Sequence, residues 1–228
     1  MLVKDWMSRN VITLNVNDTM QHAINVSMEN HISIMPVMEE GNLVGIVTDR
    51  DLKRASPSDA TLLDIQQLMY HLSRLEVGAI MSRHPITVPV DHTVEEAAET
   101  LLTNGISGAP VVDDQGKIKG IITKNDLFKA IISLSGLRKR GFQFGFLLKD
   151  KTGSIKEVTD IIRKYGGRLV SILSSYEKAP EGYRNVYIRA FDVDRDVLPH
   201  LLEELKARAA KLLYMVDHQE NKREIYDA

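Results

Sequence analysis

The sequence predicts a mixed α/β (α+β) protein, in which two copies of a β-α-β-β-α unit precede one unduplicated βαββαβ unit. A heptapeptide at residues 7–13 (Met-Ser-Arg-Asn-Val-Ile-Thr) recurs at residues 81–87 (Met-Ser-Arg-His-Pro-Ile-Thr), and matching positions continue downstream of both copies. Beyond residue 140 the repeat ends, while strand-like and helix-like apolar patterns continue to alternate. The chain therefore divides into a duplicated half and a single C-terminal unit.

The composition narrows the class of protein. The 228 residues include no cysteine, which excludes disulfides and thiolate metal sites. The 29 Lys and Arg nearly balance the 31 Asp and Glu, so charge gives no argument for nucleic acid or an anionic membrane as a partner. The apolar runs are shorter than the roughly 18 residues of a membrane span, and Asp5 and Trp6 do not fit a signal peptide. We expect a soluble cytoplasmic protein.

Each copy follows one plan. An extended Ile-Thr segment leads into an amphipathic helix, which in the second copy starts with Thr93 and Glu96 at capping-box spacing. Two short apolar strands joined by turn residues follow, and a second helix opens at Asp51 or Asp126. A copy of roughly 55 residues buries too little surface to be stable alone, so we expect the two to pack as a pair.

The expected domains follow from these patterns: repeat one at 1–60, a linker helix at 61–76, repeat two at 77–135, a C-terminal unit at 141–218 and a polar tail at 219–228.

Each copy closes with Gly-apolar-apolar-Thr-x-x-Asp, at residues 45–51 and 120–126, downstream of a Pro-Val strand. With the duplication, this motif resembles the CBS domain, which occurs as a tandem pair called a Bateman module. The resemblance implies an adenosine-containing ligand (AMP, ATP, S-adenosylmethionine or NADH) and no obligatory cofactor.

The motif residues have two interpretations. An aspartate at the start of a helix often serves only to cap it, but a carboxylate can also accept hydrogen bonds from two neighbouring ribose hydroxyls. The duplication and the resemblance favour ligand binding. They imply that ribose and phosphate contact Thr48, Arg50, Asp51, Thr123 and Asp126. They place the base against the backbone around Thr13, Ser33, Met35, Thr87, Ser107 and Ala109.

The two copies differ at this site. Gly108 leaves room for close backbone approach, whereas Ile34 occupies the matching place in the first copy. Arg50 could hold a phosphate, whereas the second copy has Asn125 in its place and Lys124 one position earlier. We expect one of the two sites to bind more tightly.

The C-terminal unit has the βαββαβ order of a ferredoxin-like fold. Its first turn, with Asp150 and Gly153, resembles that of an ACT domain, which implies an amino-acid site there; a tight capped turn is the simpler alternative. The segment 140–146 (Arg-Gly-Phe-Gln-Phe-Gly-Phe) also looks like an aromatic RNA-binding strand, but it stands first in the unit, where that motif does not belong.

A CBS pair followed by an ACT domain resembles the acetoin-utilisation protein B group. This implies a non-catalytic regulator that controls an acetoin-utilisation-like metabolic pathway through an unidentified target protein, as a homodimer or larger assembly. The sequence shows no set of catalytic residues and no histidine spacing typical of a metal site, so we expect neither an enzyme nor a metalloprotein. The alternative is a transcription- or RNA-associated regulator that uses the C-terminal unit.

Overall fold

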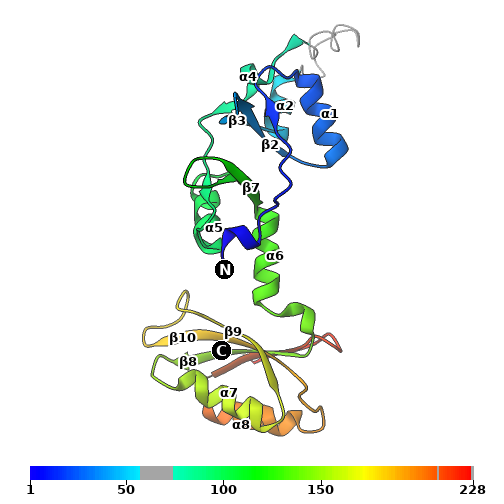
Figure 1. Ribbon diagram of the computed structural model, residues 1–228. Helices are drawn as coiled ribbons and strands as arrows, with labels where there is room; N and C mark the ends of the chain where they lie inside the picture. Colours follow the sequence, from blue (N-terminus) through cyan, green and yellow to red (C-terminus); the bar gives the residue numbers. More distant parts are fainter. Residues whose placement is uncertain (57–73, 210, 227–228) are drawn as a thin grey trace. The chain divides into compact units, whose positions relative to one another are not determined.

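The computed structural model describes residues 1–56, 74–209 and 211–226. It contains two compact units, Met1–Ala130 and Ile131–Ala228 (Figure 1). Residues 61–73, most of the predicted linker helix, lie outside the described residues.

The two repeats show the predicted β-α-β-β-α order. In each, a short strand pairs in parallel with the next strand, which forms an antiparallel hairpin with the third. The mixed α+β fold expected for the pair is therefore confirmed. The elements of the first repeat are β1 (Leu14–Asn15), α1 (Met20–Asn30), β2 (Ile34–Glu39), β3 (Asn42–Thr48) and α2 (Asp49–Ala55). Those of the second are β5 (Val88–Pro89), α5 (Val94–Thr103), β6 (Gly108–Val112), β7 (Ile118–Thr123) and α6 (Lys124–Leu134).

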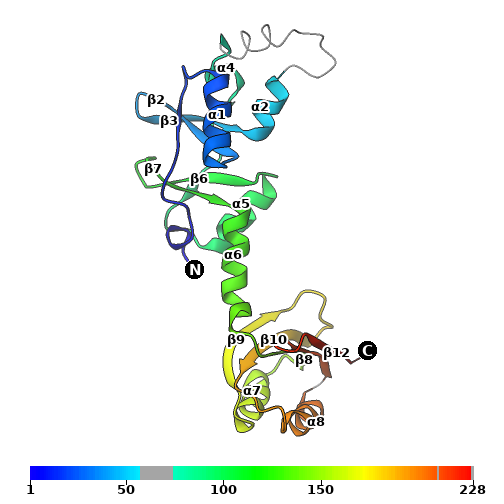
Figure 2. The same cartoon turned by 90° about the vertical axis from the view of Figure 1, so that its right-hand side faces the viewer.

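Each repeat is completed by the segment that precedes the other one. After the short helix α4 (Val77–Ile80), strand β4 (Ser82–Arg83) pairs with β3 of the first repeat. In the same way the N-terminal segment, which contains the 3₁₀ turn η1 (Val3–Asp5), runs beside the second repeat (Figures 1 and 2). Its residue Ser8 forms a β-bridge with Ile121 of that repeat. This exchange interlocks the two repeats.

The exchange explains why the methionine of the heptapeptide and the glycine of the motif recur together. The Met81 side chain occupies the space that a Cβ at Gly45 would need, and Met7 does the same at Gly120. Val77 belongs to the apolar core of the first repeat, and Val3 to that of the second. Neither core is complete without a residue from outside its own repeat.

The C-terminal unit is a five-stranded sheet with strand order β12-β11-β8-β10-β9, and its neighbouring strands are antiparallel. Helices α7 and α8 cover one face of the sheet (Figure 2). The elements are η2 (Leu137–Lys139), β8 (Phe142–Lys149), α7 (Ser154–Lys164), β9 (Arg168–Ser175), β10 (Tyr183–Phe191), α8 (Leu198–Arg208), β11 (Lys211–Asp217) and β12 (Lys222–Ile225).

Two further features of this unit emerge from the structure. The polar tail at 219–228 contains strand β12, which pairs with β11. Phe142, Phe144 and Phe146 all point into the core, with at most 2% of each side chain exposed. The aromatic strand therefore offers no ring on which an RNA base could stack.

Ser135 and Gly136, which follow α6, belong to the C-terminal unit and contact its sheet. The carbonyl of Ser135 accepts hydrogen bonds from Arg189 Nε (2.8 Å) and from Ser171 Oγ (2.9 Å). Gly136 then takes a left-handed conformation (φ +65°), and Val170 fills the space beside it. Burial lowers the pKa of the Arg189 guanidinium, which has no carboxylate partner among the described residues.

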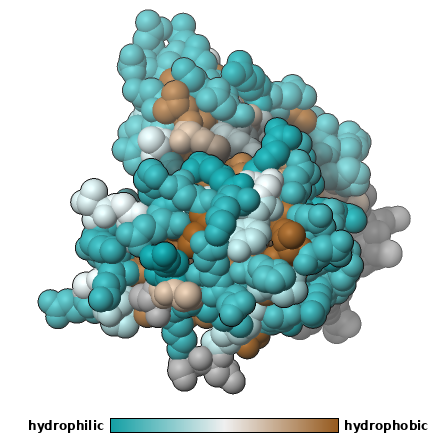
Figure 3. Space-filling view, turned by 90° about the horizontal axis from the view of Figure 1, so that it is seen from below, coloured by the Kyte–Doolittle hydropathy of each residue, from teal (hydrophilic) through white to brown (hydrophobic). Residues whose placement is uncertain are grey.

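The surface seen from below is mostly hydrophilic, and its hydrophobic residues lie in small separate groups (Figure 3). Among the described residues, no helix combines the length and the apolar character needed to cross a membrane.

Candidate functional site

The first Thr-x-x-Asp motif folds into a closed ring of hydrogen bonds where β3 meets α2. Asp51 Oδ2 accepts from the Thr48 amide (3.0 Å) and the Thr48 hydroxyl (2.7 Å), and the Asp51 amide donates back to Thr48 Oγ1 (3.4 Å). Thr48 is thus the N-cap, and Asp51 closes a capping box. The other carboxylate oxygen, Oδ1, accepts from Arg54 (3.0 Å).

The second motif repeats this geometry. Asp126 Oδ2 accepts from the Thr123 amide (3.1 Å) and hydroxyl (2.6 Å), and Oδ1 accepts from Lys129 (3.0 Å). Asp51 and Asp126 are both buried, at 7% and 4% exposed. Both aspartates therefore stabilise a helix start, and each keeps one oxygen outside the ring.

A cavity of about 520 Å³ lies beside the first motif, between the two repeats. The second repeat contributes the loop after β4 and the start of β6. Lys124, the first residue of α6, also lines the cavity. The cavity is lined by Ile46, Thr48, Asp49, Arg50, Asp51, Arg54, Ser82, Arg83, His84, Pro85, Ile86, Gly105, Ile106, Ser107, Gly108 and Lys124.

The lining combines two kinds of surface. Ile46, Pro85, Ile86 and Ile106 are apolar and suit a flat heterocycle, while Thr48, Asp51 and Ser107 supply hydroxyl and carboxylate groups. Both kinds occur at the junction of the repeats because the exchanged segment 82–86 lies against β3.

The charged side chains of the cavity are unequally paired. Arg54 forms an ion pair with Asp51, and Lys53, which lies outside the cavity, pairs with Asp49 at 3.4 Å. The side chains of Arg50, Arg83 and Lys124 have no hydrogen bond or ion pair with the described part of the chain. The cavity therefore carries a surplus of positive charge.

Four of the predicted site residues, Thr48, Arg50, Asp51 and Ser107, line this one cavity. The side chains of Met35 and Ala109 are fully buried in the cores of their repeats, and Thr13 lines a separate, shallower cavity. Ser33, Thr87, Thr123 and Asp126 do not line the cavity of the first motif.

The sequence does not indicate Arg83 or His84 as site residues, and it indicates Lys124 only for the second site. The recurrence of the heptapeptide that contains Arg83 indicates that this segment matters. The exchange of segments between repeats is what brings Arg83 to the first motif. In the second repeat, Asn125 matches Arg50 and Lys124 stands one residue before it. Lys124 lines the same cavity as Arg50, from the second repeat.

The two motifs have different surroundings. A Cβ at Gly108 would lie 2.6 Å from Ile34 Cδ1 and 2.8 Å from the Ile122 carbonyl oxygen, so this glycine permits the close packing of Ile34. The repeat places Ile34 beside the second motif at the position that Gly108 has beside the first. The second motif therefore faces a bulkier wall.

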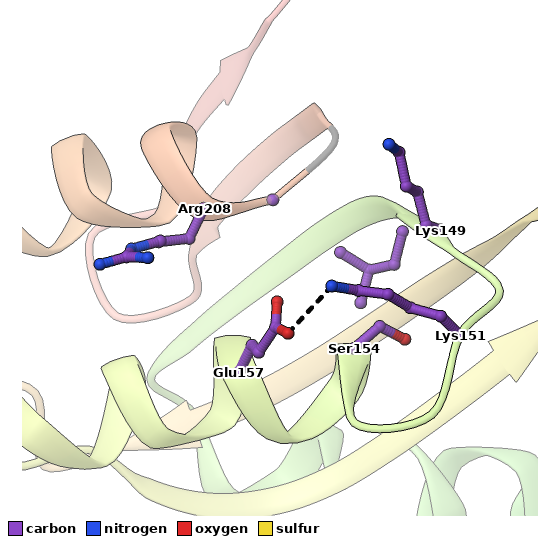
Figure 4. A pocket seen from close by; sticks show the side chains of 7 residues that line it. Lys149, Lys151, Ser154, Glu157 and Arg208 are labelled. Carbon is purple, nitrogen blue, oxygen red and sulfur yellow. Dashed lines mark hydrogen bonds and ion pairs between the residues drawn. The ribbon is translucent and has the colours of Figure 1, made fainter.

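The C-terminal unit has a smaller cavity, of about 280 Å³, at the start of α7 (Figure 4). Lys149, Lys151 and Arg208 surround it, and Lys151 pairs with Glu157 at 3.1 Å. The predicted amino-acid ligands Asp150 and Gly153 do not line this cavity. Asp150 instead accepts a hydrogen bond from Tyr176 Oη (3.4 Å), and Gly153 adopts a left-handed turn (φ +87°).

The described residues contain no group of His, Asp and Glu side chains that could hold a metal ion.

Comparison with known proteins agrees with this architecture. Residues 3–58 and 77–133 match the CBS domain family. A CBS domain-containing protein of Dictyostelium discoideum is 34% identical over 134 residues, which cover 58% of this chain and 92% of that protein. The crystal structure of protein MJ1225 from Methanocaldococcus jannaschii has a TM-score of 0.50 and 29% identity, covering 57% of this chain and 47% of that one.

A further structure is the CBS domain pair of protein MJ0100 in complex with 5′-methylthioadenosine and S-adenosyl-L-methionine. It has a TM-score of 0.48 and 30% identity, and it covers 57% of this chain and 95% of that one.

The fold and the site define a tandem pair of repeats with a cavity at their junction. The chain belongs to the family of CBS domain-containing proteins.

Proposed function

We propose that this protein is a non-catalytic regulator that binds an adenosine-containing nucleotide at the junction of its two CBS repeats. The observation that carries this proposal is the cavity that brings Thr48 and Asp51 of one repeat next to Ser107 of the other. Its apolar wall, its carboxylate and its unpaired cations match the three parts of a nucleotide: base, ribose and phosphate.

In this arrangement the base lies against Ile86 and Ile106, and the ribose hydroxyls donate to Asp51. Among the described residues, the Oδ1 atom of Asp51 has one partner, Arg54, whose side chain is 71% exposed, so a ribose hydroxyl can join or replace it. The capping ring on Oδ2 holds the carboxylate in place for this contact.

The second motif forms the weaker position of the pair. Thr123 and Asp126 repeat the carboxylate geometry, but Ile34 and Asn125 replace the glycine and the arginine of the first site. We therefore expect one nucleotide to bind first, beside Asp51.

The C-terminal unit is proposed as an ACT-like regulatory module that responds to an amino acid, and the assembly as a homodimer that acts on a target protein of an acetoin-utilisation-like pathway. The resemblance of the βαββαβ order to that family supports this assignment, as does the observed strand order of the sheet.

The test is titration calorimetry of the full chain with AMP, ATP, S-adenosylmethionine and NADH. At least one of them should bind, and Asp51→Asn should weaken its binding by about 10–100-fold, because a charge-assisted hydrogen bond contributes about 1.5–3 kcal/mol. The matching 2′-deoxyribose nucleotide should also bind more weakly.

Asp114→Asn is the matched control, because Asp114 is an exposed carboxylate in the β6–β7 turn, away from the cavity. Absence of binding by every adenosine compound, or equal affinity in the Asp51→Asn protein, would refute the proposal.

A further inference from the structure

The cations of the first cavity distinguish between the classes of adenosine compound that it could hold. Arg50 comes from the first repeat, while Arg83 and Lys124 come from the second. Among the described residues that line it, Asp49 and Asp51 are the only carboxylates, and both already have a cationic partner. Three positive charges are left without a counter-charge among the described residues.

An unpaired cation in a partly enclosed cavity favours an anionic ligand, because the cavity walls exclude water and strengthen the interaction. Arginine is suited to phosphate, since its planar fork can donate two hydrogen bonds to two oxygens. Lys124 adds a point charge at the N-terminal end of α6. A ligand with a sulfonium cation, such as S-adenosylmethionine, would add a further positive charge to the same cavity.

The second motif provides an internal comparison. The repeat places Asn125, Arg9 and Asp49 at the positions that Arg50, Arg83 and Lys124 have in the first site. Of these three, Arg9 already donates to the Lys4 carbonyl (3.1 Å), and Asp49 is negative. The surplus of positive charge therefore belongs to the first site and is not a general feature of the fold.

We propose that the cavity beside Thr48 and Asp51 selects adenosine ligands by their phosphate chain, taking ATP or ADP in preference to AMP and excluding S-adenosylmethionine, through Arg50, Arg83 and Lys124. This inference rests on the proposed function, since it specifies the ligand of the same site.

Calorimetry with adenosine, AMP, ADP, ATP and S-adenosylmethionine at constant ionic strength tests it. Affinity should increase with each phosphate, with ATP at least tenfold tighter than adenosine, and S-adenosylmethionine should bind more weakly than AMP. Raising the salt concentration should weaken ATP binding more than adenosine binding.

The double variant Arg83→Gln, Lys124→Gln should reduce the ratio of ATP to adenosine affinity at least tenfold. Lys117→Gln is the control, because this exposed lysine lies outside the cavity. The inference is overturned if adenosine or AMP binds as tightly as ATP, if S-adenosylmethionine binds as tightly as AMP, or if the double variant keeps the wild-type ratio.

Inorganic triphosphate and CTP separate this failure from failure of the proposed function. If both bind as tightly as ATP while adenosine does not bind, the cations select phosphate but the site is not one for adenosine. If adenosine binds as tightly as ATP, the adenosine site stands and phosphate selection is rejected. If none of these compounds binds, both proposals are wrong.

Discussion

At the scale of single residues, each motif aspartate has a structural role that is independent of any ligand. Without its carboxylate, the Thr48 or Thr123 amide at the helix start loses its acceptor. We therefore predict that Asp51→Ala and Asp126→Ala each lower the free energy of unfolding of the N-terminal unit by about 1–2 kcal/mol in the absence of nucleotide.

Thermal unfolding followed by the fluorescence of Trp6, the single tryptophan of the chain, measures this change in the N-terminal unit. Asp114→Ala is the control and should change stability by less than about 0.5 kcal/mol. Wild-type stability in both motif variants would show that the capping rings contribute nothing.

The sequence identifies Thr48 and Asp51 as candidate site residues, because their spacing is repeated and their chemistry is local, and both line the cavity. It did not predict Arg83 and Lys124 as their neighbours. Arg83 reaches the first motif because its segment completes the sheet of the first repeat, and Lys124 reaches it from the start of α6 in the second repeat. No local sequence pattern reports either neighbour.

At the scale of elements, most helices and strands followed from apolar periodicity and capping signals, including the capping box at Thr93 and Glu96. Strand β12 did not, because its residues are mostly polar and it is an edge strand held by pairing with β11. The turn between them depends on Asp217, which accepts hydrogen bonds from the amides of Gln219 (2.9 Å) and Glu220 (3.2 Å).

Asp217 makes this hairpin sensitive to acid. Burial acts to raise the pKa of the Asp217 carboxyl, but hydrogen bonds from Arg195 and from the turn amides outweigh it, and the pKa lies below its usual value. A carboxyl whose pKa is lowered on folding stabilises the fold fully above its unfolded pKa of about 3.9, and this stabilisation is lost as the pH falls through the lower folded value.

We predict that Asp217→Asn destabilises the β11–β12 hairpin by about 1–2 kcal/mol at pH 7. This value lies in the lower part of the range for a charged hydrogen bond, because Arg195 is partly exposed and solvent screens its charge. The difference between variant and wild type should shrink as the pH falls below about 4. Hydrogen exchange of the amides of residues 211–217 measures the local stability of the hairpin in variant and wild type. Asp196→Asn is the control, and an equal difference at pH 7 and pH 3 would exclude Asp217 as the cause.

At the scale of the whole molecule, helix α6 is apolar on more than one side. Leu127 and Ala130 are buried in the core of the second repeat, yet Phe128 and Ile131 are 59% and 57% exposed, and Ile132 is 39% exposed. Residues 128, 131 and 132 lie on one face of a helix. The sequence periodicity of α6 predicted a helix, but it could not show which of its apolar residues remain exposed.

An exposed apolar helix face is typical of a surface that contacts another protein, and the commonest such contact is a symmetric one with a second copy. We therefore predict that the chain is a dimer held together through this face of α6. Light scattering at micromolar concentration should give twice the chain mass of 25.7 kDa.

The double variant Phe128→Glu, Ile131→Glu should give a monomer, because four carboxylates would meet across the interface. Its circular dichroism spectrum should be unchanged, because both side chains are already exposed. Leu102→Glu, a substitution on α5 at a residue that is 78% exposed, should remain dimeric. A monomeric wild type would rule out the dimer, and a double variant that stays dimeric would place the interface elsewhere than on α6.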